Sequence, residues 1–543
     1  MSHFPTTGHL ESRTRVSGTR SVYPGQTSQS GCACPLCEFD EWMYLFISHV
    51  GAVYRCTNCG LTRLHPQPTK SEVLASPAES TDHNLFGDDN HLATSPIEQD
   101  AVRFYSQVLE RHGASKSEIL VIAPKGHPFA AMSVSRGYEV KTSLDAQELM
   151  QSSLPLGHYD SAVVIFQLEK APNPITALGQ IHAALKPDGL LLLVTPSLDS
   201  WAARFFRSQW PEWRRENLYY FDAQTIQSAL LRSGFARIHV TRNQRRYSLQ
   251  HLYDRSRALP QTGLTRLIRS LYHVMPGPLR WGVRLRLPVS GIIVTARRVE
   301  RRKRPLLSIV MPIYNERPTF PTTMNAVIAK EVPGVDKEIV VVESNSTDGT
   351  RELVLGYQDC PRVKVVLEDR PRGKGHAVRT GFEHAKGNFI LIQDGDQEYD
   401  VNDYDALIEP LRTYQRAFVL GSRHIKGDWK VRKFIDQPFL ATFFNFGHFL
   451  FATALNLLYG QRLRDPFTMY KVFRRDCLHG LTFECNRFDF DFELVIKLLK
   501  KGYIPLEVPV NYQSRSLKQG KKVSVLRDPL TWIWALIRFK FWS

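Results

Sequence analysis

The strongest constraint on the fold is a pattern in residues 306–423, where short apolar runs each end in a cluster of polar residues. These runs with their polar ends are LLSIVMPIYNE (306–316), KEIVVVESNSTDGT (337–350), RVKVVLE (362–368), GNFILIQDGD (387–396) and AFVLGSR (417–423). Helix-like segments fill the intervals, and this alternation predicts a parallel sheet covered on both faces. Such sheets bind ligands beyond the carboxyl ends of their strands, so the polar clusters mark the expected ligand edge.

One of these clusters contains two aspartates, Asp394 and Asp396, with Gly395 between them to allow a tight turn. Two carboxylates at this spacing can reach one hard divalent cation, which prefers oxygen ligands. The cation can in turn neutralise a diphosphate. Acidic pairs are also common in solvated loops, so this motif needs support from the rest of the chain.

The composition allows several domains and favours anionic partners. At roughly 150 residues per domain, a chain of 543 residues predicts about three units, and 43% apolar residues suffice for sizeable cores. Lys and Arg number 70 against 53 Asp and Glu, which gives a net charge of +17. This excess suits nucleic acid, a lipid headgroup surface or a phosphorylated small molecule, without choosing among them.

Residues 32–68 contain two C-x-x-C pairs, Cys34 with Cys37 and Cys56 with Cys59. This spacing is typical of a zinc ribbon, in which four thiolates form a closed shell around a structural Zn²⁺. Cys32 is an alternative to Cys34. Residues 1–31 are polar and lack the apolar core of a secretory signal, so we expect a disordered tail there.

Residues 97–245 alternate strand-like and helix-like segments, and they predict a Rossmann-like domain. The motifs FQLEKAPNP, LKPDGLLLLVTPS and LYYFDAQTIQSALLRSGF resemble those of class I methyltransferases that use S-adenosylmethionine (SAM). The resemblance implies a Gly-rich turn after the first strand and an acid after the second, where this chain offers Gly126 and Asp145. SAM is therefore a candidate cofactor, and a scaffold domain that has lost SAM is the favoured interpretation.

Residues 246–304 are rich in arginine, and we expect them to form a basic linker. A solvated linker and a segment attached to anionic lipid both suit this composition. Nucleic acid is a third class of partner, but no recognition motif accompanies the charge, and we expect no nucleic-acid partner.

The C-terminal region, residues 305–527, resembles a family 2 glycosyltransferase of the GT-A fold, most closely the polyprenyl-phosphate (dolichol-phosphate) sugar transferases. The motifs that carry this resemblance are PIYNE, VESNSTDGT, RGKGHAVRTGF, QDGDQEY, GSR, DPFTMYKVFRRD and RFDFDFELVIKLLKKGYIPLEVPVNYQSRS. The chain is thus predicted to be a multidomain α/β protein with a zinc ribbon, a Rossmann-like methyltransferase-type domain and a GT-A glycosyltransferase domain.

The resemblance implies roles for residues in each motif. Those expected to bind a nucleotide-sugar donor are Pro312, Tyr314, Glu316, Glu343, Arg372, Lys374 and Asp394. Those expected to bind Mg²⁺ or Mn²⁺ are Asp394, Asp396 and Glu398. Those expected to contact an acceptor phosphate are Arg423, Arg432, Arg515 and Lys521.

The implied reaction is an inverting displacement at the anomeric carbon, with the metal stabilising charge on the departing nucleoside diphosphate. A lipid-phosphate acceptor is already anionic and needs no general base, whereas a sugar hydroxyl needs one. Asp465 is the candidate base, and a helix cap or an ion pair with Arg462 or Arg464 is an equal alternative. Arg423 is the second catalytic candidate; Asp489, Asp491 and Glu493, in FDFDFE, receive less weight.

Two segments suit a membrane surface. Residues 439–459 place apolar side chains at helical spacing, which predicts an amphipathic helix that is buried or lies on a bilayer surface. Residues 528–543 combine Trp with basic residues, as is typical of the interface. We expect a cytoplasmic protein held peripherally at the inner face of the membrane. The leading hypothesis is a nucleotide-sugar transferase; the alternatives are a bifunctional enzyme that also methylates and a non-catalytic binding protein.

Overall fold

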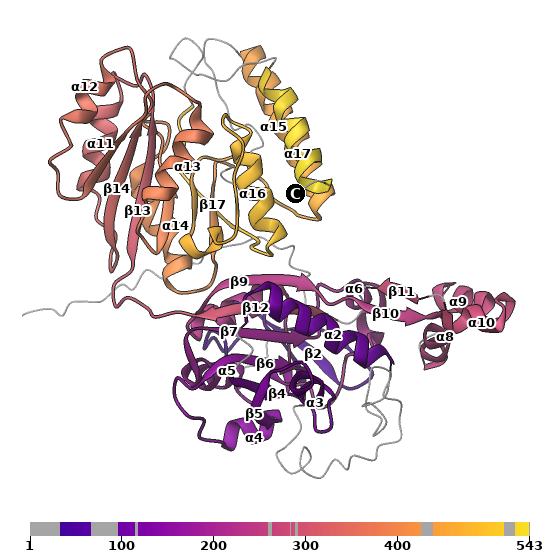
Figure 1. Cartoon of the computed structure of the whole chain (residues 1–543). Coiled ribbons are helices and arrows are strands. Elements are labelled where there is room, and N and C mark those ends of the chain that lie inside the picture. Colours follow the sequence, from indigo (N-terminus) through magenta and orange to yellow (C-terminus); the bar gives the residue numbers. More distant parts are fainter. Residues whose placement is uncertain are drawn as a thin grey trace, which may run out of the picture.

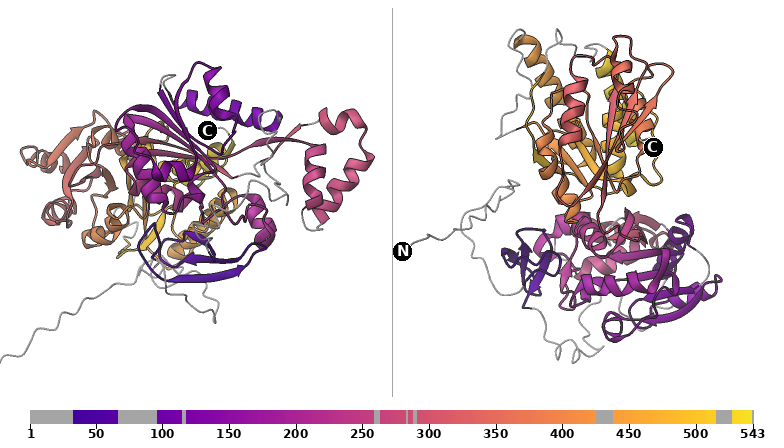
Figure 2. Two further views of the ribbon diagram at one scale, coloured as in Figure 1. Left: turned by 90° about the horizontal axis from the view of Figure 1, so that it is seen from below. Right: turned by 90° about the vertical axis from the view of Figure 1, so that its left-hand side faces the viewer.

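A computed structural model of the chain describes residues 33–66, 96–114, 118–258, 263–282, 284–287, 291–424, 438–514 and 527–541. The tail at 1–31, Cys32, Arg432, Arg515 and Lys521 lie outside the described residues. Two α/β bodies are stacked on one another, with a small β-ribbon on the flank of the N-terminal body and a helical arm that projects from it (Figures 1 and 2).

The small ribbon is joined to the N-terminal body through a shared sheet. Its strands, in spatial order, are β1 (Trp42–Ile47), β2 (Ala52–Cys56), β3 (Thr62–His65) and β8 (Tyr219–Tyr220). Strand β3 pairs antiparallel with β8, which belongs to the N-terminal body by sequence. An ion pair of 3.1 Å between Arg55 and Asp222 reinforces this junction.

The N-terminal body is built on a six-stranded sheet. Its strands, in spatial order, are β5 (Glu139–Leu144), β4 (Glu118–Ile122), β6 (Tyr159–Ile165), β7 (Leu185–Thr195), β12 (Ile292–Arg298) and β9 (Phe235–Arg242). The helices of this body are α2 (Pro96–Arg111), α3 (Phe129–Val134), α4 (Ala146–Gln151), α5 (Pro174–Ala184), α6 (Trp201–Phe206) and α7 (Ala223–Arg232). Strands β5, β4, β6 and β7 run parallel, whereas β12 is antiparallel to both of its neighbours.

The expectation of a linker over residues 246–304 is wrong in two places. Strand β12 lies inside the sheet, because the β-branched run IIVT buries all of its side chains there. Between β9 and β12 the chain forms the arm, defined here as β10 (Arg245–Ser248), α8 (Leu249–Ala258), α9 (Gly263–Val274), α10 (Gly277–Gly282) and β11 (Arg284–Leu287). Strands β10 and β11 pair antiparallel at its base.

The C-terminal body is built on a seven-stranded sheet. Its strands, in spatial order, are β15 (Val363–Leu367), β14 (Asp336–Glu343), β13 (Leu306–Ile313), β16 (Phe389–Ile392), β18 (Lys471–Arg474), β17 (Phe418–Ser422) and β19 (Leu506–Pro509). Its covering helices are α11 (Phe320–Ala329), α12 (Thr350–Leu355), α13 (Lys374–His384), α14 (Tyr404–Arg412) and α16 (Phe490–Lys500). Each of the five apolar runs forms a strand, and the predicted α/β multidomain class is confirmed.

Two further helices, α15 (Pro438–Tyr459) and α17 (Arg527–Phe541), pack against each other beside α16 (Figure 1). The Tyr459 hydroxyl donates to the Leu536 carbonyl at 3.0 Å, and the rings of Phe451 and Trp532 meet edge to face. Across the described residues, no helix combines the length and apolar character needed to cross a bilayer.

The two bodies meet at a buried seam. Tyr503, after α16, is fully buried, and its hydroxyl donates to the Ile238 carbonyl of β9 at 2.6 Å. The Gln227 amide donates to the Gly502 carbonyl, and the Ser228 hydroxyl to the Tyr414 carbonyl, both at 2.8 Å. One core cluster runs across this seam, so the bodies form a continuous packed unit.

Candidate functional site

The Asp-Gly-Asp turn lies directly against the loop that follows β13. A Cβ on Gly395 would approach Ile313 Cδ1 to 2.5 Å, so a larger residue would displace that buried side chain. From the same loop, the Thr319 hydroxyl donates to the Gly395 carbonyl at 3.1 Å. The acidic turn and the PIYNE segment are therefore held together, as expected for neighbouring strand ends of one sheet.

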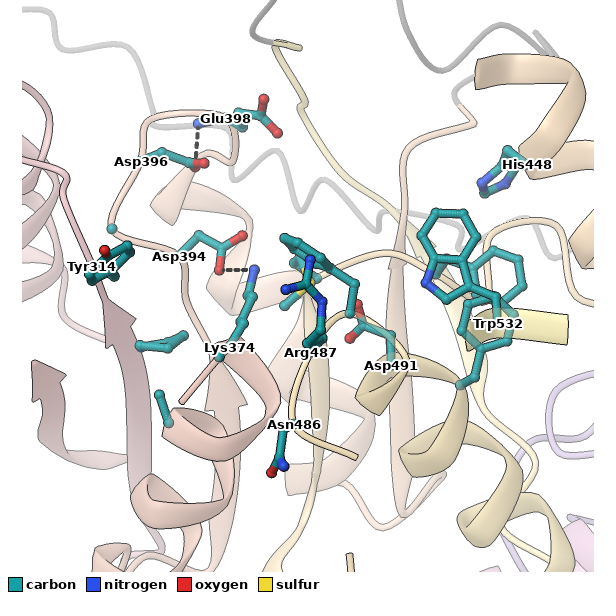
Figure 3. A pocket seen from close by; sticks show the side chains of 18 of the residues that line it. Tyr314, Lys374, Asp394, Asp396, Glu398, His448, Asn486, Arg487, Asp491 and Trp532 are labelled. Atoms are coloured by element: carbon teal, nitrogen blue, oxygen red, sulfur yellow. Dashed lines mark hydrogen bonds and ion pairs between the residues drawn. The ribbon is translucent and has the colours of Figure 1, made fainter. Parts of the chain in front are cut away.

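These strand ends border a cavity of about 940 Å³. Its charged and polar lining includes Tyr314, Glu316, Ser344, Arg372, Lys374, Asp394, Asp396, Glu398, Arg423 and Tyr512, and Pro312 also lines it. Figure 3 shows Tyr314 and the three acids on one side and His448 and Trp532 on the other, with Lys374 between them. Most of the predicted binding residues thus share one cavity.

Lys374, the first residue of α13, forms an ion pair with Asp394 at 2.5 Å (Figure 3). Burial alone would lower the pKa of Lys374, but the neighbouring carboxylates, Asp394 first among them, raise it above its usual value. Lys374 therefore stays cationic at physiological pH, beside the predicted phosphate-binding edge.

The three acids expected to bind a metal all line the cavity but each has another partner. Asp394 pairs with Lys374, Asp396 accepts the Glu398 amide N–H at 3.1 Å, and Glu398 accepts the Tyr512 hydroxyl at 2.8 Å. These carboxylates are not among the described groups whose ligand atoms converge within 4.8 Å. The donor set suits Mg²⁺ or Mn²⁺ chemically, although the side chains are not gathered around one point.

Asp465, the candidate base, lies behind the cavity wall. It is fully buried and accepts hydrogen bonds from Nε and a terminal nitrogen of Arg423 at 2.8 and 2.7 Å, and from the Arg423 amide at 2.8 Å. Burial alone would raise the pKa of Asp465, but the Arg423 guanidinium outweighs burial and holds that pKa well below its usual range. The ion-pair partner is Arg423 rather than Arg462 or Arg464.

Arg423 itself lines the cavity. Its guanidinium lies 5.3 Å from the ring of Tyr512, whose hydroxyl donates to Glu398. On its other side, Asp465 lies 3.6 Å from His448 Nε2. The buried Asp465 carboxylate therefore fixes the Arg423 guanidinium at the cavity wall.

Glu343, expected to face the nucleotide base, does not line the cavity. It is fully buried, accepts the amide N–H groups of Asn345 and Ser346 at 3.1 and 2.6 Å, and pairs with Arg351 at 3.2 Å. Its role in the described geometry is to shape the turn after β14. The neighbouring Ser344 lines the cavity instead.

Other cavity residues were not singled out in the sequence. Asn486, Arg487 and Phe488 line it from the segment before α16. Asp491, given little weight, lines it as well and pairs at 2.9 Å with Lys471, which is buried in β18. The alternation of acids and phenylalanines in FDFDFE pointed to this segment. It could not single out Asp491, because Lys471, the buried lysine that pairs with it, is 20 residues away.

The side of the cavity opposite the acids is apolar. It is lined by α15, α16 and α17 through Phe444, Phe446, Leu450, Phe451, Phe492, Trp532 and Ile533, together with Phe467. The Phe492 ring stacks between Phe467 and Trp532, with centroids at 4.2 and 5.7 Å. A ligand that fills the whole cavity must therefore be charged at one end and apolar at the other.

The small ribbon brings together Cys34, Cys37, Cys56 and Cys59, whose Sγ atoms all lie within 4.8 Å of one another. The Cys34–Cys59 and Cys37–Cys56 sulfur pairs are each 3.5 Å apart. Four thiolates at these separations fit a tetrahedral zinc shell with Zn–S bonds of about 2.3 Å. The predicted ligand set is the one that the fold assembles.

At the methyltransferase-like ligand edge, the acid expected to bind the ribose contacts other residues of the chain. Asp145 follows β5 directly, and its Oδ1 accepts the amides of Gln147 and Glu148 at 2.9 Å as the N-cap of α4. Its Oδ2 lies 3.7 Å from Lys125 Nζ, which also pairs with Glu148 at 3.2 Å. Both oxygens of the acid expected to hold a ribose are engaged, so these residues do not fit SAM well.

Residues 308–481 match the family model for glycosyl transferase family 2, and residues 95–240 match one for a methyltransferase domain. Glycosyltransferase AglJ of Haloferax volcanii is 29% identical over 223 residues, covering 40% of this chain and 67% of that protein. Dolichol-phosphate mannosyltransferase of Pyrococcus furiosus is 26% identical over 237 residues, covering 43% and 64%. The chain thus spans about two thirds of these relatives.

Among solved structures, glucosyl-3-phosphoglycerate synthase from Mycobacterium tuberculosis, in complex with Mn²⁺, UDP-glucose and phosphoglyceric acid, is 20% identical. The match covers 44% of this chain and 80% of that chain, with a TM-score of 0.32.

Proposed function

We propose that this protein is a metal-dependent, inverting glycosyltransferase, since residues 308–481 match the family model for glycosyl transferase family 2. The donor is a nucleotide diphosphate sugar, and the acceptor is a polyprenyl phosphate or a related glycolipid. The observation that carries this proposal is the cavity, which joins a charged wall at the strand ends to an aromatic wall made by three helices. A lipid phosphate has the same division between an anionic head and an apolar tail.

The charged wall suits the donor. Lys374 and Arg372 line the cavity where a diphosphate would meet the predicted phosphate-binding loop. Mg²⁺ or Mn²⁺ held by Asp394, Asp396 and Glu398 would supply charge stabilisation to the leaving diphosphate. Lys374 neutralises Asp394 in the described geometry, so the cation and the lysine act on the same carboxylate.

The buried ion pair between Arg423 and Asp465 favours a phosphate acceptor over a hydroxyl acceptor. Asp465 is committed to Arg423 by three hydrogen bonds, so it is a poor general base. An acceptor phosphate requires no base, and a fixed guanidinium suits an anionic oxygen. Arg423 would orient that oxygen toward the sugar.

The outer surface of α15 and α17 suits a bilayer. The exposed apolar side chains of these helices that do not line the cavity are Phe449, Leu457, Trp534, Ile537 and Phe541. Aromatic and aliphatic side chains of this kind bind the headgroup boundary when their helix lies flat on it. We place the enzyme peripherally, at the inner face of the membrane, with the cavity opening toward its lipid acceptor.

The test is a transfer assay on the full chain with Mn²⁺ or Mg²⁺, a panel of radiolabelled nucleotide sugars, and polyprenyl phosphate in detergent micelles. We expect label to enter the lipid fraction with one donor, and the same donor with Mn²⁺ to raise the melting temperature. Transfer to a free sugar, and none to polyprenyl phosphate, would reject the lipid-phosphate acceptor. A Lys374→Met variant should lose transfer while keeping the fold.

A further inference from the structure

The arm exposes a row of apolar side chains that the catalytic cavity does not use. Leu267, Leu271 and Val274 of α9 are 55%, 47% and 85% exposed. Their spacing of four and three residues puts them on one face of the helix. Leu279 of α10 is also 46% exposed, so the apolar surface continues beyond α9.

This surface is exposed although the arm is well packed elsewhere. The rings of Tyr253 in α8 and Tyr272 in α9 stack with centroids 3.8 Å apart. Arg269 donates to the Ser256 carbonyl, and the Arg280 guanidinium lies 4.4 Å above the Tyr272 ring. The opposite side of α9 is therefore the packing side, and the apolar row points away from it.

The arm is strongly cationic. Residues 245–287 contain nine arginines and one acidic residue, Asp254. Arg257 and Arg266 are exposed, and Arg266 precedes the first leucine of the row. An apolar row flanked by arginine is the pattern of a helix that lies in the interface of an anionic membrane.

We infer that the arm is a membrane-binding element, which inserts Leu267, Leu271 and Val274 at the headgroup boundary of an anionic bilayer. Nucleic acid would satisfy the arginines but would leave the apolar row in water. A second copy of the chain would cover the row, but it would bring together two strongly cationic arms. An anionic lipid surface satisfies both features.

The test is flotation of the full chain with vesicles of phosphatidylcholine, with and without phosphatidylglycerol, at low and high salt. We expect Leu267→Glu/Leu271→Glu to reduce binding to the anionic vesicles by about tenfold or more. The matched control is Leu156→Glu, because Leu156 is 81% exposed but lies outside the arm; this change should leave binding unaltered. Arg257→Gln/Arg266→Gln should weaken binding mainly at low salt.

Unchanged binding of the double leucine variant, or an equal loss in the Leu156→Glu control, would overturn the inference. The inference would also be overturned if, without lipid, the wild type sedimented as a dimer and the double leucine variant as a monomer. That result would identify a second copy of the chain as the partner that covers the apolar row. Transfer to detergent-solubilised polyprenyl phosphate should be the same in the arm variants and the wild type. Failure of the arm can therefore be told apart from failure of the proposed enzyme activity.

Discussion

The two α/β bodies place polar side chains at the same kind of edge and use them differently. In the N-terminal body, Asp145 after β5 caps its own helix and faces Lys125. In the C-terminal body, Asp394 after β16 borders a cavity and pairs with Lys374. The polar side chains at a strand end can form a ligand site only where they line a cavity.

Glycines make the same contrast. Gly395 is pressed against Ile313, so the turn between the aspartates depends on a missing side chain. Gly126, at the corresponding turn of the N-terminal body, has a positive φ of 78°, but a Cβ there would meet nothing within 4 Å. The first glycine serves a close approach, whereas the second serves only a bend.

The largest expected effect is on the acids of the C-terminal body. Asp394→Asn/Asp396→Asn should lower transfer by about a thousandfold, since loss of metal-supported charge stabilisation is worth several kcal/mol. The matched change in the other body, Asp145→Asn, keeps a capping oxygen and should leave transfer within about twofold. Initial rates and thermal melts measure both. Equal losses in the two variants would remove the functional contrast between the bodies.

The second largest effect is expected from the buried ion pair between Arg423 and Asp465. Asp465→Asn leaves a buried guanidinium without its carboxylate and should destabilise the C-terminal body by about 3–5 kcal/mol. Arg423→Met/Asp465→Leu should recover most of that stability, yet transfer should remain lost. Chemical denaturation and the transfer assay separate the two quantities. An Asp465→Asn variant with unchanged stability and no transfer would instead support a general base.

The third effect is on the zinc ribbon. Cys56→Ser should release bound zinc and remove the stabilisation that metal supplies, about 3 kcal/mol at free zinc roughly a hundredfold above its Kd. Metal analysis and differential scanning calorimetry provide the measurements. Wild-type zinc content in this variant would exclude Cys56 as a ligand.

A smaller effect is expected from Glu169, a buried acid in the 3₁₀ turn Leu168–Lys170 that follows β6. Burial raises the pKa of Glu169 to about 7, and Thr195 donates to it at 3.0 Å. Because the folded state binds the proton more tightly, stability is lost as the pH rises from about 4.5 to about 7. Glu169→Gln should remove this loss, so it should stabilise the protein by about 2 kcal/mol more at pH 8 than at pH 5. Melting temperatures of the wild type and of Glu169→Gln, measured across this pH range, test the prediction. A variant that is more stabilised at pH 5 than at pH 8 would contradict it.

The smallest expected effect is that of SAM. The engaged oxygens of Asp145 predict no binding heat and no change in melting temperature on titration with SAM. Saturable binding would contradict the scaffold interpretation. It would also restore the hypothesis of a bifunctional enzyme.

Local pattern sufficed for much of this architecture. Patterns of a few residues predict the five apolar strands, the two C-x-x-C pairs and the Asp-Gly-Asp turn. Contacts between residues far apart in the sequence could not be predicted in this way. The pairing of Arg423 with Asp465 joins positions 42 residues apart, and strand β12 was hidden because arginines surround its short apolar run.

The cavity shows the same limit. Its charged wall follows from strand ends, which topology brings to one edge. Its aromatic wall depends on how α15, α16 and α17 pack on one another, and periodicity alone does not give that arrangement. Glu343 had the expected position in the chain, but its side chain turned inward to satisfy backbone amides.

The seam at Tyr503 has a consequence for how the chain can be divided. The Tyr503 hydroxyl donates to the Ile238 carbonyl of the other body, and one core cluster continues from body to body. A fragment that contains only one of the two bodies would expose part of this shared core to water. Truncated proteins are therefore expected to be less stable than the intact chain.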